Sequence, residues 1–191
     1  FMRSTAIATL FVLLCAPAAA GETTSCPAAS WDARADEQPS FERWFEDGTI
    51  RLDYEHSGTA SEEAVTLHAI RSEGPWAGSR VWLMDPTGFG KYRGEVRDAD
   101  SGDLLWSLGY CTLFGEWQTT EEAKGIRKTF PETLRFPRPK AAVEVSLLSR
   151  GRDGSFNRIW TKTLTPKELP EEAGTKPGGG PEVLLLRGAS P

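Results

Sequence analysis

The sequence has 191 residues, of which 39% are hydrophobic and 26% are charged. This length allows one domain together with a targeting segment and a tail, and the apolar fraction is sufficient for a packed core. The net charge of −5, with lysine and arginine scattered along the chain, argues against nucleic acid and anionic membrane surfaces as partners.

Residues 1–20 have the pattern of an export signal. Arg3 supplies a positive charge, residues 6–14 are apolar, and residues 18–20 are small. The apolar run is too short for a permanent membrane anchor. A lipid-modified Cys15 is the alternative, but the residue before it is not small. We therefore expect an exported protein, periplasmic or extracellular, whose mature chain begins after residue 20.

Alternation of apolar and polar residues predicts β-strands. It is strictest over residues 49–55, where Ile50, Leu52 and Tyr54 share one face. Turn-forming residues separate the strand-like runs, and the turn at 98–103 predicts a hairpin. The other runs with strand character are residues 65–69, 91–97, 104–108, 142–148 and 156–164.

One short helix is expected between these strands. Thr119 and Glu122 have the spacing of a capping box ahead of residues 123–126, and Pro131 prevents a long continuation. Residues 136–140 alternate with proline and are expected to be extended. Together the signals predict an all-β fold, an antiparallel β-sandwich with one short inserted helix.

Composition divides the chain into segments. Residues 21–40 are small, polar and acidic, as in a flexible lead, and residues 41–165 hold the predicted sandwich. Residues 166–180 are rich in proline, glycine and charge, which is typical of an interdomain linker. Residues 181–191 include the apolar run 183–186, which we expect to begin a downstream domain.

Motifs for catalysis, metal binding or phosphate binding are missing from the sequence. His56 and His68 lie apart, and neither belongs to an H-E-x-x-H motif. We expect His68 to face solvent from a strand. The acidic run 98–103 lacks the ligand spacing of a calcium loop, so we interpret it as an acidic hairpin turn. We therefore expect neither catalysis nor a metal or cofactor in this chain.

The cysteines leave two interpretations open. Export would allow a disulfide between Cys26 and Cys111. The other interpretation of Cys111, which lies in a strand-like run, is a small buried hydrophobic residue.

The seven tryptophans indicate either core packing or a surface that stacks on sugar rings, and we favour packing. Trp82 and Trp106 lie in strand-like runs and are expected in the core. Trp76 and Trp117 lie beside turn and helix signals, so they are the candidate surface or interaction residues.

Five segments follow one another in the order that a known family shows. They are Thr49-Ile-Arg-Leu-Asp-Tyr54, Trp76-Ala-Gly78, Gly115-Glu-Trp-Gln-Thr-Thr-Glu-Glu-Ala123, Phe130-Pro-Glu132 and Phe136-Pro-Arg-Pro-Lys140. Together they resemble the N-terminal domain of the IgA-peptidase family of bacterial zinc metallopeptidases, over about residues 41–166. In that family this domain precedes a catalytic domain with an H-E-x-x-H zinc motif. The resemblance implies a β-sandwich, an exported location, and zinc in a peptidase domain outside this chain.

The expected function is therefore that of a non-catalytic accessory domain. It would dock on, or present a protein substrate to, a downstream peptidase domain in the same polypeptide. The alternative is a free-standing exported binding module for carbohydrate or a host protein, supported by the tryptophan content. A complete small enzyme has almost no residues in its favour.

Overall fold

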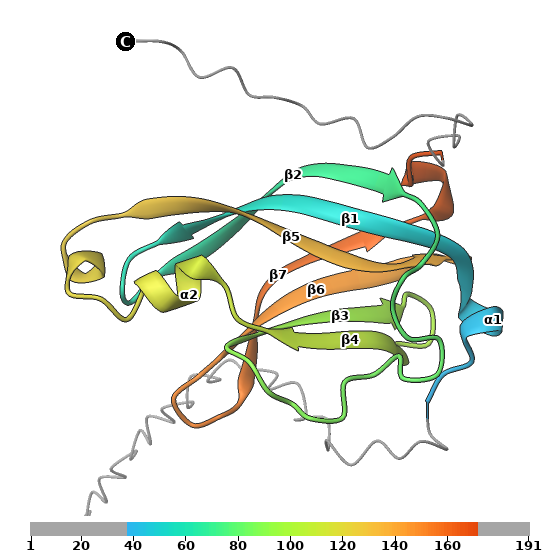
Figure 1. Cartoon of the computed structure of the whole chain (residues 1–191), viewed down its shortest axis with the longest axis horizontal. Coiled ribbons are helices and arrows are strands. Elements are labelled where there is room, and N and C mark those ends of the chain that lie inside the picture. The colour runs from blue at the N-terminus through green and yellow to red at the C-terminus, as the bar shows by residue number, and fades with distance from the viewer. Residues whose placement is uncertain (1–37, 172–191) are drawn as a thin grey trace, which may run out of the picture.

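The computed structural model describes residues 38–171, which form two antiparallel β-sheets packed face to face (Figure 1). One sheet has the order β2-β1-β5 and the other β4-β3-β6-β7. This confirms the predicted β-sandwich. The strands are β1 (Phe45–Gly58), β2 (Glu63–Glu73), β3 (Tyr92–Asp98), β4 (Leu104–Tyr110), β5 (Lys128–Pro139), β6 (Val143–Arg150) and β7 (Phe156–Leu164).

Strand β1 shows why the alternation predicted this fold. Ile50, Leu52 and Tyr54 are buried as predicted, with exposed fractions of 3% or less. They face the second sheet, while the intervening Arg51 and Asp53 lie on the outer face and form a salt bridge with an N–O distance of 2.7 Å. The predicted hairpin at 98–103 is also confirmed, since β3 and β4 pair across it.

The structure differs from the prediction at strand β5. Only residues 136–140 were expected to be extended, because prolines at positions 131, 137 and 139 obscured the strand pattern. A proline lacks the N–H that a central strand needs, but an edge strand tolerates it. Strand β5 is an edge strand that pairs with β1 alone.

The predicted capping box is wrong. Helix α2 (Leu113–Trp117) begins earlier, and Thr112 caps it by accepting a hydrogen bond from the Gly115 amide at 3.1 Å. The Thr119 hydroxyl instead donates to the Glu116 carbonyl at 2.7 Å, at the end of this helix. Residues Glu122–Lys124 form a separate 3₁₀ turn, η2.

The sequence predicted one short helix, whereas two further short helices flank the strands within residues 38–171. Helix α1 (Phe41–Trp44) precedes β1, and the 3₁₀ turn η3 (Pro166–Glu168) follows β7. Leu169, which follows η3, is 6% exposed and packs in the main core. The packed domain thus continues a few residues into the segment that composition assigned to a linker. None of the short helices between residues 38 and 171 has the length and apolarity of a membrane span.

Of the two tryptophans predicted to lie in the core, one is buried and the other is exposed. Trp106 is 5% exposed and packs in the core between the sheets, as predicted. Trp82 is 51% exposed, so its assignment to the core was wrong. It belongs to no strand; it lies in the long connection between β2 and β3, residues 74–91. We call this connection loop 74–91.

Loop 74–91 runs along the outer edge of strand β4 (Figure 1). The Ser107 amide donates to the Leu83 carbonyl at 2.9 Å, and the Asp85 amide donates to the Ser107 carbonyl at 3.2 Å. Farther along, the Gly109 amide donates to the Asp85 carboxylate at 3.0 Å. These bonds occupy much of the edge of β4, so a further strand cannot pair along this part of the edge.

The predicted leader, the lead segment up to residue 37 and the segments from residue 172 onward lie outside the described residues.

Candidate functional site

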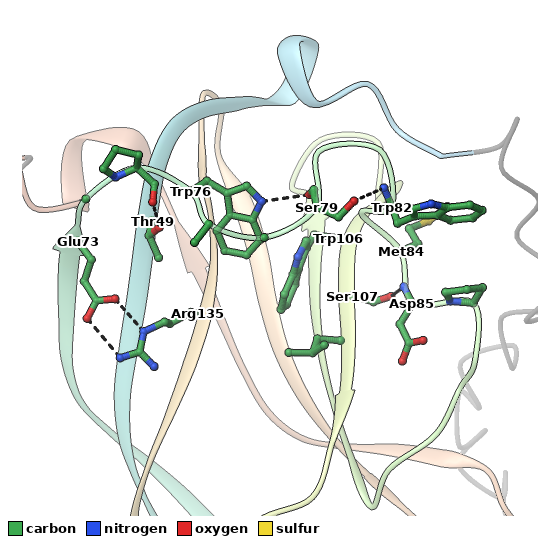
Figure 2. Close-up of a pocket in the computed structure, with 16 residues that line it drawn as sticks. Thr49, Glu73, Trp76, Ser79, Trp82, Met84, Asp85, Trp106, Ser107 and Arg135 are labelled. Atoms are coloured by element: carbon green, nitrogen blue, oxygen red, sulfur yellow. Dashed lines mark hydrogen bonds and ion pairs between the residues drawn. The ribbon is translucent and has the colours of Figure 1, made fainter.

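An apolar groove of about 760 Å³ lies between loop 74–91 and strand β4 in the described part of the chain (Figure 2). We call it the tryptophan groove. Its apolar lining includes Trp76, Trp82, Met84, Trp106 and Leu108. Concave apolar surfaces of this size are where proteins most often bind partners or ligands.

Trp76 lines the groove and contacts several neighbouring residues. Its indole N–H donates to the Ser79 carbonyl at 3.1 Å, and its ring meets Trp106 edge-on, with 6.4 Å between the ring centroids. The ring also lies directly over Gly78, where a Cβ would stand 2.2 Å from the indole. Only glycine permits this close packing at position 78. This half-buried residue therefore forms part of the groove, and its role in an interaction stays a prediction.

Trp82 is presented to solvent by a local turn. The Ser79 hydroxyl accepts hydrogen bonds from the Val81 amide at 3.2 Å and the Trp82 amide at 2.8 Å. This fixes the backbone while leaving the side chains outside: Val81 is 70% exposed. Phe89, in the same loop, is 76% exposed, and Leu108 on the adjoining strand is 43% exposed. Exposed large hydrophobic side chains are thus concentrated in this loop and on the adjoining strand.

The charged side chains at the groove already form hydrogen bonds with other groups of the domain. The Arg135 guanidinium contacts Glu73 at 2.8 Å, and this hydrogen bond holds the pKa of the Glu73 carboxyl below its ordinary value. The Asp85 carboxylate accepts hydrogen bonds from Thr87 and from the Gly109 amide. The groove therefore offers apolar contact area with a charged rim, and no nucleophile–base pair of the kind that catalysis requires.

A second cluster lies in the interior around His56, which is 1% exposed. The ring nitrogens lie 3.1 Å from Glu132 and 3.2 Å from Glu63. The imidazole stacks on Phe114, with 3.9 Å between the ring centroids. The Tyr92 hydroxyl is 3.3 Å from the Glu63 carboxylate. We call these residues the His56 cluster.

Burial and charge act in opposite directions on the His56 cluster. Desolvation lowers the pKa of His56, but the hydrogen bonds with Glu132 and Glu63 raise it, and the net pKa lies above its ordinary value. Desolvation raises the pKa of Glu63, whereas the hydrogen bond with His56 lowers it, and the net pKa lies below its ordinary value. Burial also raises the pKa of Tyr92, which keeps its proton at neutral pH.

The buried position of His56 was not predicted from the sequence. A signal was present, since His56 continues the inward-facing series Ile50, Leu52 and Tyr54 at the same two-residue spacing. Its partner Glu132 is 76 residues away, and only the pairing of β1 with β5 places the two side chains together.

The structure also shows the exposure of the other residues that the sequence singled out. Trp117 is 9% exposed and donates its indole N–H to Glu122 at 2.8 Å, so it is a core residue rather than a surface platform. Cys111 is exposed, not a buried hydrophobic residue. Its pairing with Cys26 stays a prediction, because Cys26 lies outside the described residues. His68 faces solvent as predicted.

The acidic turn and the outer sheet face are structural. Asp98 accepts a hydrogen bond from the Ser101 amide at 2.9 Å, and Gly102 adopts a positive φ of 77°, so the run is a hairpin turn as interpreted. Asp53 pairs with Arg51 and Arg71 across the first sheet. Between residues 38 and 171, no group of three or more His, Cys, Asp or Glu side chains is arranged to hold a metal ion.

Comparison with known proteins agrees with the resemblance noted in the sequence. A family described as the peptidase M64 N-terminus matches residues 40–161 of the 191. The matched region includes loop 74–91 and both partners of His56. No curated protein matches the chain. Because the match covers well over half of the sequence, this chain belongs to the family of N-terminal domains of M64 peptidases.

Proposed function

We propose that this accessory domain docks on the peptidase domain of its own polypeptide, through the tryptophan groove and the exposed side chains of loop 74–91. The observation that carries the proposal is the concentration of uncovered apolar side chains there. Three of the six exposed large hydrophobic residues between positions 38 and 171 lie in this loop, and Leu108 lies beside it. A partner that covered them would remove apolar area from water.

The course of the chain supports a partner in the same polypeptide. The Arg138 guanidinium donates to the Pro170 carbonyl at 2.8 Å and to the Ser72 hydroxyl at 3.3 Å. Ser72 adjoins Glu73 on the rim of the groove. The last described residues, red in Figure 1, therefore lie beside the end of β2 from which loop 74–91 starts. Whatever follows Glu171 begins its path close to the groove.

The wider proposal follows from the family. The parent protein would be an exported zinc metallopeptidase, with the zinc ion held by the peptidase domain and a protein as its substrate. A carbohydrate-binding module is the alternative, and the exposed indole of Trp82 favours it. Sugar recognition also needs free planar polar side chains beside the ring. Glu73 and Arg135 already pair with each other, and the Asp85 carboxylate already accepts from Thr87 and Gly109. Protein docking is therefore better supported.

Replacing Trp82 by aspartate tests this proposal. In a two-domain protein, which carries the sandwich and the peptidase domain, Trp82→Asp should weaken docking by about 2 kcal/mol or more, as for a central interface aromatic. The same substitution in the 191-residue chain should change stability by only about 0.5 kcal/mol, because the side chain is exposed. Thermal unfolding of both proteins measures the difference.

Ile126→Asp is the matched control. Ile126 is 49% exposed, close to the 51% of Trp82, and lies outside the groove. It should have little effect in either protein. Equal effects of the two substitutions in the two-domain protein would contradict docking through the groove. Identical melting of the sandwich alone and in tandem would contradict docking through any face.

A further inference from the structure

While Glu63 and Glu132 are both ionised, only the doubly protonated imidazole of His56 satisfies the geometry of the His56 cluster. Both ring nitrogens of His56 face carboxylate oxygens, at 3.1 Å from Glu132 and 3.2 Å from Glu63. A neutral imidazole has one N–H, so it would turn a lone pair toward one of these carboxylates. The imidazolium donates to both. The arrangement is therefore that of a buried cation between two anions.

The groups around the cluster come from several elements. Tyr54 of β1 bonds to the Tyr110 hydroxyl of β4 at 3.2 Å, and Tyr92 of β3 lies beside Glu63. The Lys91 ammonium lowers the pKa of Glu63 through its charge and is itself bonded to Ser149 at 3.0 Å. From α2 and the residue after it, the cluster meets the ring of Phe114 and the amide of Gln118 rather than a charge. His56 is thus the only cation that hydrogen-bonds either carboxylate directly among the contacts of the described residues.

The same cluster joins the end of the β1–β2 hairpin to helix α2. Glu63 is the first residue of β2, and Phe114 of α2 stacks on His56. Gln118 donates to the Thr59 carbonyl at 3.1 Å and lies 3.2 Å from the Tyr92 hydroxyl. A Cβ on Gly58 would stand 2.9 Å from the Phe114 ring. The hairpin turn and the helix therefore rest against each other across His56.

We infer that protonated His56 is a latch that holds the 58–63 turn and helix α2 against the end of the sandwich. When His56 loses a proton, the lone pair on one of its ring nitrogens faces a glutamate carboxylate inside the domain. The charge of that carboxylate is then unpaired, which is strongly disfavoured in the interior. Glu63 is the partner that can escape, because its side chain is 19% exposed and that of Glu132 only 7%. When the Glu63 side chain moves into water, the 58–63 turn and helix α2 are no longer held against the sandwich.

Amide hydrogen exchange of the 191-residue chain tests the latch. Exchange is compared at about pH 6 and about pH 9, on either side of a raised histidine pKa, after correction for the intrinsic pH dependence of exchange. Between the lower and the higher pH, peptides covering 58–63 and 113–118 should lose protection relative to strand β6. The expected loss is about tenfold for each unit by which the two carboxylates raise the pKa of His56. In His56→Gln this pH dependence should disappear, whereas the exposed control His68→Gln should retain it.

Titration by NMR supplies a measurement that needs no variant. The latch requires the ring protons of His56 to titrate above the ordinary histidine value of about 6.5. Retention of the full pH-dependent loss of protection in His56→Gln would overturn the latch. So would a His56 resonance that titrates at or below about pH 6.5.

Discussion

Replacing His56 by alanine is expected to lower the free energy of unfolding by about 3–5 kcal/mol at about pH 6. His56 is 1% exposed, and both of its ring nitrogens contact carboxylates. Its removal leaves Glu63 and Glu132 facing each other without the cation that pairs them. Denaturant unfolding of the 191-residue chain measures the loss. His68→Ala, on the exposed face of β2, should change stability by only about 0.5 kcal/mol.

The pH dependence of this difference has a defined sign. The pKa of His56 is raised in the folded protein, so its contribution is complete below the unfolded value of about 6.5 and is lost as pH rises through the folded value. The pKa of Glu63 is lowered, so its contribution is complete above about 4.3 and is lost as pH falls through the folded value. The stability difference between the wild-type chain and His56→Ala should therefore be greatest between about pH 4.3 and 6.5. A difference that grew toward alkaline pH would contradict this account.

Truncating Phe136 to alanine is expected to destabilise the domain by about 3–5 kcal/mol. Phe136 is fully buried on β5, and its ring lies 6.2 Å from that of Trp106 across the sandwich. The substitution removes contacts between the two sheets and leaves a cavity that the paired strands cannot close.

Phe89→Ala provides the matched control, because it makes the same change at a side chain that is 76% exposed. Its effect on the 191-residue chain should stay within about 0.5 kcal/mol. Chemical denaturation of the two variants in parallel would show the contrast. A loss for Phe136→Ala as small as that for Phe89→Ala would mean that the two sheets do not share the core described above.

Local sequence patterns predicted the structure correctly where a single physical effect determines it. The two-residue alternation of β1 predicted its inward face, and the glycine and aspartate residues at 98–103 predicted a hairpin turn, which the structure confirms. Strand β5 was missed because its three prolines resemble a loop, and only its place at the edge of a sheet makes them acceptable. The capping signal at Thr119 failed because Thr112, seven positions earlier in the sequence, caps the helix instead.

The two clusters of interest depend on contacts distant in sequence. Trp82 was assigned to the core because its neighbours are apolar, but loop 74–91 follows the edge of β4 and turns the side chain outward. Trp76 and Trp106 meet only because that loop returns to the second sheet. Likewise, the two-residue spacing could place His56 inside, but it could not identify Glu132 as its partner. Strand pairing determines the His56 cluster, and the packing of a loop on a sheet edge determines the tryptophan groove.

Docking of loop 74–91 on the peptidase domain can be followed by hydrogen exchange across this loop. The 191-residue chain and the two-domain protein are compared under one condition, and peptides covering residues 79–89 are followed. Docking should slow the exchange of these residues in the two-domain protein and leave exchange unchanged around Ile126, which lies outside the groove. Equal exchange of residues 79–89 in the two proteins would contradict it.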